Sequence, residues 1–210
     1  VNLLFGMTAG TSVIVARSYG AKDKDALSRA VHTSMLFSVI GGIVVMTIGL
    51  LVCRWGLTLM GTKADIFESA VLYMTIIICG VPASSIFNFA ASIIRSTGDS
   101  KTPFVILAST GVVNIVFNLI FVILFHMGVA GAAIATVISS YTCCFICFIL
   151  TRNKKLAVNI RGLKNTKFEI SEIKQVLSVG LGTSFERCSL VLGKILVTAM
   201  YADLSAIVIS

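Results

Sequence analysis

Two asparagines within an apolar run are the side chains of this sequence best suited to chemistry. Asn114 and Asn118 lie four residues apart in VVNIVFNLIF, so on a helix their amides share one face. A buried amide must be hydrogen-bonded to another helix or to water. The spacing fits the wall of a polar cavity and a set of interhelical hydrogen bonds equally well.

Thr136 is expected at the same depth as this pair. The short connection HMG joins two apolar runs, which must therefore form an antiparallel helical hairpin. Asn118 lies eight residues before His126 and Thr136 ten residues after it, so both lie about 12–15 Å from the turn. The sequence thus predicts a hydrogen-bonded cluster of Asn114, Asn118 and Thr136.

Glu186 places a carboxylate inside the last apolar run, roughly 18 Å beyond Lys174 if the intervening residues are helical. Because charge is costly at that depth, such a carboxylate could bind a coupling proton or Na⁺. Arg187 and Lys194 lie in the same run. A structural ion pair with either is an equally good explanation, and both interpretations stay open.

Pro82 interrupts the apolar run ICGVPASSIFNFAASII. A proline inside a helix removes a hydrogen bond and usually bends the helix, which here serves packing around neighbours or a moving hinge. Asn88 lies beyond the proline on the same helix and is a further candidate for a polar cavity.

Catalytic and metal-binding patterns are missing from the sequence. It holds no H-E-x-x-H, G-x-S-x-G or P-loop pattern. Cys144 and Cys147 form a C-x-x-C within an apolar run, without a second pair or a nearby histidine, so we interpret them as packing residues. We therefore predict neither an enzyme nor a metal or cofactor site.

The elements that must hold these residues are apolar helices. The 210 residues are 57% hydrophobic and 12% charged with a mean hydropathy of +0.99, which excludes an ordinary soluble domain. Six runs are long enough to span a bilayer as helices. They cover residues 1–19, 30–53, 69–94, 103–125, 129–151 and 176–201. We predict an all-α, polytopic transmembrane helical bundle of six spans.

Basic residues are distributed as expected for a multi-pass membrane protein and not as a nucleic-acid-binding patch. Thirteen lysines and arginines lie in or beside the first, third and fifth connections, against two in the second and fourth. This asymmetry places the odd-numbered connections in the cytoplasm. The basic fifth connection, residues 152–175, is expected to lie near anionic headgroups and to divide two bundles. Because the chain begins and ends inside apolar runs, we interpret it as an internal segment of a longer protein.

Three stretches together resemble the multidrug and toxic compound extrusion (MATE) family. They are GMTAGTSVIVARSYGAKDKDALSRA, VPASSIFNFAASIIRSTGDSKTPFVI and NIVFNLIF followed by HMGVAGAAIATVIS. The resemblance implies about half of a twelve-helix, two-lobe transporter in the cell membrane. Residues 1–151 would be family helices 2 to 6 of the N-terminal lobe, residues 152–175 a cytoplasmic linker, and residues 176–210 the first helix of the C-terminal lobe.

The resemblance also implies a function and roles for individual residues. The function is efflux of cationic or amphipathic small molecules by H⁺ or Na⁺ antiport with alternating access. Asn114 and Asn118 match the family's polar pair on the fifth helix, and Thr136 matches a threonine on the sixth. Glu186 lies on the seventh helix, whose acid binds the coupling cation in many members, but the usual G-x-P there reads Gly180-Leu181-Gly182. A lipid-linked precursor flippase of the same superfamily and a non-transporting membrane scaffold are the alternatives.

Overall fold

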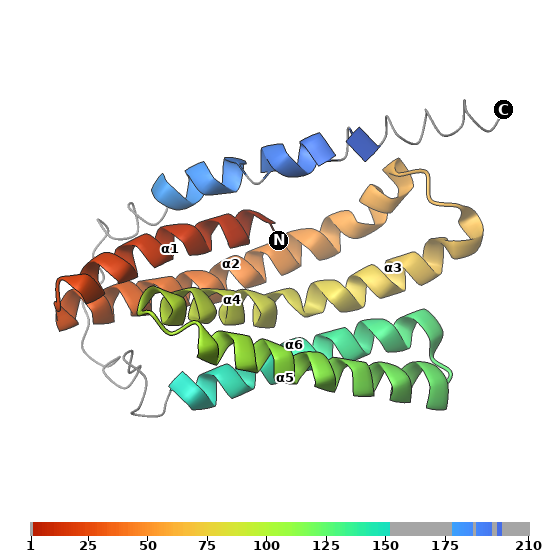
Figure 1. Cartoon of the computed structure of the whole chain (residues 1–210). Coiled ribbons are helices and arrows are strands. Elements are labelled where there is room, and N and C mark those ends of the chain that lie inside the picture. Colours follow the sequence, from red (N-terminus) through yellow and green to blue (C-terminus); the bar gives the residue numbers. More distant parts are fainter. Residues whose placement is uncertain (1, 152–177, 187, 195–196, 199–210) are drawn as a thin grey trace.

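Long apolar runs with few helix breakers fold here as helices. The computed structural model describes residues 2–151, 178–186, 188–194 and 197–198 (Figure 1). Its elements are α1 (Asn2–Gly20), α2 (Lys24–Leu59), α3 (Ala64–Cys79), α4 (Val81–Ser96), α5 (Lys101–Asn118), the π-helix η1 (Leu119–Leu124) and α6 (Gly128–Thr151). A further helix occupies residues 178–186 and 188–194. The predicted all-α class is confirmed.

The length and surface of these helices fit a bilayer. Among the described residues, three helices, α2, α5 with η1, and α6, are long and apolar enough to cross it. The bent pair of α3 and α4 is a fourth if the two helices are counted together as one broken span. Large apolar side chains lie on the outside, with Leu51 77% and Phe104 70% exposed. Such a surface suits lipid and not water, so the predicted polytopic membrane bundle is confirmed.

Asp23 fixes the start of α2, six residues before the apolar run that predicted this span. Its carboxylate accepts hydrogen bonds from the backbone N–H groups of Asp25 and Ala26, both at 3.0 Å. This cap satisfies donors that the first helical turn leaves unpaired. At 36 residues α2 is about 54 Å long and therefore extends beyond the roughly 30 Å hydrocarbon layer.

The core of the bundle forms around α4, which packs against α1, α2 and α6. Phe89, Ile93 and Ile94 of α4 are each at most 1% exposed. Hydroxyl groups join the helices where small residues allow close approach. Ser85 Oγ donates to the Ser38 carbonyl at 2.9 Å, and Ser92 Oγ donates to the Thr8 carbonyl at 2.8 Å. Such bonds are typical of helix contacts in membranes.

The predicted hairpin after the fourth apolar run is present, but the first helix ends differently from the prediction. α5 and α6 pack against each other, as the short HMG connection requires. The six residues before the turn form the π-helix η1 instead of continuing α5. The Phe125 N–H accordingly donates to the Ile120 carbonyl, five residues back, at 3.0 Å. The chain then reverses through His126 and Gly128, whose φ angles are 51° and 54°.

Candidate polar site

Asn114 and Asn118 form a hydrogen-bonded pair at the end of α5. Asn118 Nδ2 donates to the backbone carbonyl of Asn114 at 2.9 Å and to its side-chain Oδ1 at 3.0 Å. Both side chains are half-buried. The pair therefore satisfies part of its own hydrogen-bonding capacity, while the Asn114 amide nitrogen and the Asn118 oxygen can still bind another group. The π-helix begins at the next residue, and such turns are frequent at functional sites.

Thr136 and Asn88 each bond to their own helix. Thr136 is exposed, and its hydroxyl donates to the Ala132 carbonyl at 2.9 Å and not to the asparagine pair. Asn88 Nδ2 donates to the Ser84 carbonyl at 2.6 Å. The structure thus brings together two members of the predicted polar set and leaves Thr136 and Asn88 as separate polar positions. The role of all four in a cavity stays a prediction.

Pro82 lies in the first turn of α4, just beyond a 40° bend between α3 and α4. Neighbours on two sides hold the bend. A Cβ atom on Gly42 of α2 would lie 2.9 Å from Pro82 Cα, and one on Gly80 would lie 3.2 Å from Val137 Cγ2 of α6. Both glycines therefore permit helix approaches that a larger residue would prevent. A role of Pro82 as a moving hinge stays a prediction.

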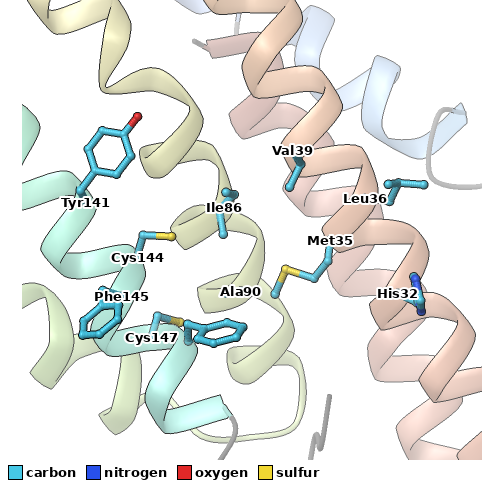
Figure 2. Close-up of a pocket in the computed structure, with 11 residues that line it drawn as sticks. His32, Met35, Leu36, Val39, Ile86, Ala90, Tyr141, Cys144, Phe145 and Cys147 are labelled. Carbon is cyan, nitrogen blue, oxygen red and sulfur yellow. The ribbon is translucent and has the colours of Figure 1, made fainter. Parts of the chain in front are cut away.

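Tyr141 of α6 joins that helix to the bend between α3 and α4, a contact that the sequence did not predict. Its hydroxyl donates to the Cys79 carbonyl at 3.1 Å, at the last residue of α3 (Figure 2 shows this side chain). The bond gives a donor to a carbonyl at the helix break and fixes α6 to the bend. The available signal was a tyrosine within an apolar run, since a phenol hydroxyl among apolar groups usually finds a hydrogen-bond partner.

Glu186 lies on the helix that follows residues 152–177, and its side chain is exposed. Lys194 is also exposed, whereas Arg187, the other predicted ion-pair partner, lies outside the described residues. This helix packs on α1. Thr183 Oγ1 donates to the Gly6 carbonyl at 2.7 Å, and a Cβ atom on Gly6 would lie 2.6 Å from the Ser184 nitrogen. Gly6 therefore permits the close approach of this helix to α1.

Asp99 caps α5 from the turn between α4 and α5. Its Oδ1 accepts hydrogen bonds from the Lys101 and Thr102 N–H groups at 3.1 and 3.0 Å, and its Oδ2 accepts one from the Thr102 hydroxyl at 2.5 Å. The bonds from the Thr102 side chain and backbone hold the pKa of Asp99 below its ordinary value. The aspartate of the STGDSKT stretch thus has a structural role, which its position three residues before Thr102 could have indicated.

The candidate site contains amide and hydroxyl side chains. Among the described residues no three histidine, cysteine or acidic side chains are placed to hold a metal ion. Fold and site together define a polytopic helical membrane protein with a hydrogen-bonded pair of amides on the apolar helix α5. A sequence profile of the MatE family matches residues 1–120, more than half of the chain. The chain therefore belongs to the MatE family of membrane transporters, as the predicted resemblance indicated.

Individual relatives agree with this assignment. The chain is 30% identical over 159 residues to the probable multidrug resistance protein YoeA of Bacillus subtilis, covering 74% of this chain and 34% of that protein. An inward-facing MATE multidrug resistance transporter has a TM-score of 0.83 at 27% identity, covering 89% of this chain and 42% of that one. An outward-facing one has a TM-score of 0.85 at 28% identity, covering 92% and 43%. The chain thus spans less than half the length of these relatives.

Proposed function

We propose that the full-length protein exports small organic molecules across the cell membrane by H⁺ or Na⁺ antiport, and that it is a transporter and not an enzyme. In this proposal residues 1–151 form most of the N-terminal lobe, residues 152–175 the cytoplasmic linker, and residues 176–210 the first helix of the C-terminal lobe. Membership of the MatE family carries the proposal, because its relatives include multidrug resistance proteins.

Alternating access is supported by the likeness to two transporter states. The fold matches the inward-facing and outward-facing structures almost equally well, with TM-scores of 0.83 and 0.85. A lobe whose helices rearranged greatly between the states would match one of them better. We therefore propose that this lobe moves as one body, as inverted-repeat and two-lobe transporters commonly do.

Asn114 and Asn118 are proposed to line the substrate cavity, with Thr136 and Asn88 as further polar positions. Neither amide titrates, so the pair can bind substrate but cannot release a proton. Glu186 is the carboxylate proposed to bind the coupling cation. The Glu186 side chain is exposed, and its helix packs against α1. In this proposal that contact is the junction between the N-terminal and C-terminal lobes.

The absence of positive charge from two helices supports cationic or amphipathic substrates. From Thr102 to Thr151 the sequence contains no lysine or arginine, so nothing on α5 beyond its first residue, or on α6, repels an organic cation. A flippase for a lipid-linked, negatively charged precursor would need a cationic cavity instead. This observation favours drug export over the flippase alternative.

Ethidium accumulation tests the proposal in cells. The full-length protein is expressed in a bacterial host whose own multidrug exporters are deleted, and ethidium fluorescence is followed with and without an uncoupler. Active export should lower accumulation below the empty-vector level, and collapse of the gradient should restore it. Accumulation equal to the vector control at equal membrane expression, for ethidium and for a panel of other organic cations, would contradict export.

A further inference from the structure

A groove lies on the flank of the bundle, apart from the asparagine pair. It runs between α2 and α6 with α4 as its floor, and its volume is about 640 Å³ (Figure 2). Met35 and Val39 of α2 lie opposite Cys144 and Cys147 of α6, with Ala90 of α4 between them. The size falls in the range of sites for small ligands. No acidic side chain lines the groove, so it offers nothing to pair with a cationic drug.

A bilayer centred on α2 would hold the groove within one of its leaflets. If the length of α2 beyond the hydrocarbon layer is shared between its ends, each end extends by about 12 Å. His32 is eight residues into α2 and is therefore at the hydrocarbon boundary. From His32 to Val39, and from Phe148 back to Tyr141, each wall is about 10 Å long. That is about two thirds of the roughly 15 Å hydrocarbon depth of one leaflet.

The two ends of the groove differ in polarity. At the deep end the Tyr141 hydroxyl is bonded to the Cys79 carbonyl. At the other end Arg29 lies one turn before His32 on α2, and among the described residues this end of the bundle also holds five further basic residues against three acidic ones. The basic residues are Arg17, Lys22, Lys24, Arg95 and Lys101, and the acidic ones are Asp23, Asp25 and Asp99. The opposite end of the described bundle holds two of each, Arg54 and Lys63 with Asp65 and Glu68.

We propose that this groove binds one acyl chain of an anionic glycerophospholipid, whose headgroup lies at the basic end beside Arg29 and His32. The apolar walls match the chain in polarity and depth, and the positive end matches the phosphodiester charge. Each buried methylene group of the acyl chain makes the free energy of lipid binding more favourable, and basic side chains near the membrane surface attract anionic headgroups. The lining of the groove includes none of the polar residues proposed for the substrate and cation sites, so it is a different site.

Photolabelling of the full-length protein tests this site. The protein is placed in nanodiscs of phosphatidylcholine that contain a small fraction of phosphatidylglycerol with a diazirine in its acyl chain. After irradiation, labelled peptides are identified by mass spectrometry. Label should be concentrated on α2 between His32 and Val39 and on α6 between Tyr141 and Phe148. The matching diazirine phosphatidylcholine should label these peptides much less.

Substitutions in the groove separate binding from random contact with lipid. Val39→Trp fills the groove and should lower labelling about tenfold. This is the loss of affinity expected when about two methylene groups of the acyl chain can no longer be buried in the groove. Ile40→Trp is the matched control, because Ile40 is the next residue, is 53% exposed and does not line the groove. Cys144→Phe fills the groove from the opposite wall if Val39→Trp does not fold.

Three outcomes would overturn the proposal. The first is label spread evenly over the lipid-facing helices of the unsubstituted protein. The same even labelling is expected if another part of the full chain or a partner protein covers the groove. The second is labelling that is unchanged by both filling substitutions. The third is equal labelling by phosphatidylcholine and phosphatidylglycerol. None of these outcomes depends on transport, so the proposal can fail while drug export stands.

Discussion

The Asn114 and Asn118 pair gives the sharpest test at the scale of single residues. Asn118→Leu removes the donor of both hydrogen bonds within the pair but keeps an apolar side chain of similar size. Because one hydrogen bond in a membrane contributes roughly 0.6–2 kcal/mol, we expect insertion and folding to survive. Export should fall at least about tenfold, since a polar cavity wall is lost.

Asn118→Asp is the matched control for this substitution. It keeps the size and polarity of the side chain, but replaces the donor amide with a carboxyl group that titrates beside Asn114 and donates a hydrogen bond only when protonated. Export should therefore continue and should acquire a dependence on pH. If purified Asn118→Leu protein exports ethidium at the unsubstituted rate, the two amides serve only to hold helices together.

Glu186→Gln separates ion coupling from ion pairing. Since the carboxylate is exposed, a pair with a basic neighbour would add only about 0–1 kcal/mol, and the melting temperature should hardly change. Transport driven by an ion gradient should be lost, whereas exchange of labelled for unlabelled substrate without a gradient should persist. Normal gradient-driven export combined with a lower melting temperature would reject the coupling role.

Helix contacts through glycine are the feature to test at the scale of elements. Gly6→Ala places a methyl group 2.6 Å from the Ser184 nitrogen and should separate α1 from the helix carrying Glu186. We expect a loss of about 1–3 kcal/mol in the free energy of unfolding, as for other overpacked sites. Thermal unfolding of the purified full-length protein measures it.

Gly111→Ala is the control for the Gly6 substitution, because nothing lies within 4 Å of the added methyl group. It should be neutral or raise stability by up to about 1 kcal/mol through helix propensity. Equal melting temperatures for Gly6→Ala and the unsubstituted protein would show that the helix does not pack on Gly6 in solution.

The positions of the helices could be predicted from the sequence more accurately than the hydrogen bonds of individual side chains and helix ends. Run lengths and the HMG turn were sufficient to predict the long helices, because hydrocarbon requires every backbone group to bond within its own segment. They could not predict that Asp23 would start α2 six residues before its apolar run, since capping depends on one polar side chain. Nor did they predict the π-helix, whose hydrogen bonds differ from those of α5 by one residue.

The candidate site was predictable in its residues but not in its contacts. Helical spacing placed Asn114 and Asn118 on one face, where they bond to each other. Depth alone suggested that Thr136 would join them, but a threonine hydroxyl in a helix readily bonds to the carbonyl four residues back. The contact of Tyr141 could not be predicted, because its partner is the Cys79 carbonyl at the bend between α3 and α4, and the sequence did not show which helix packs against that bend.

At the scale of the whole molecule, the charge asymmetry predicts an orientation. Residue 100 lies at the basic end of the bundle and residue 62 at the opposite end. In a cysteine-free background of the full-length protein, Thr62→Cys should react with an impermeant maleimide in intact cells. Ser100→Cys should react only after permeabilisation. The reverse pattern would invert the proposed topology.

Reconstituted transport is the most direct measurement of the central claim, that this lobe belongs to a cation-coupled drug exporter. Full-length protein is incorporated into proteoliposomes, an inward-directed or outward-directed Na⁺ or H⁺ gradient is imposed, and ethidium flux is followed by fluorescence. We predict flux against the ethidium gradient that follows the direction of one of the two ions and falls at least about tenfold in Asn118→Leu. Flux that ignores both ion gradients, or no flux with correctly folded protein across a panel of organic cations, would contradict the account.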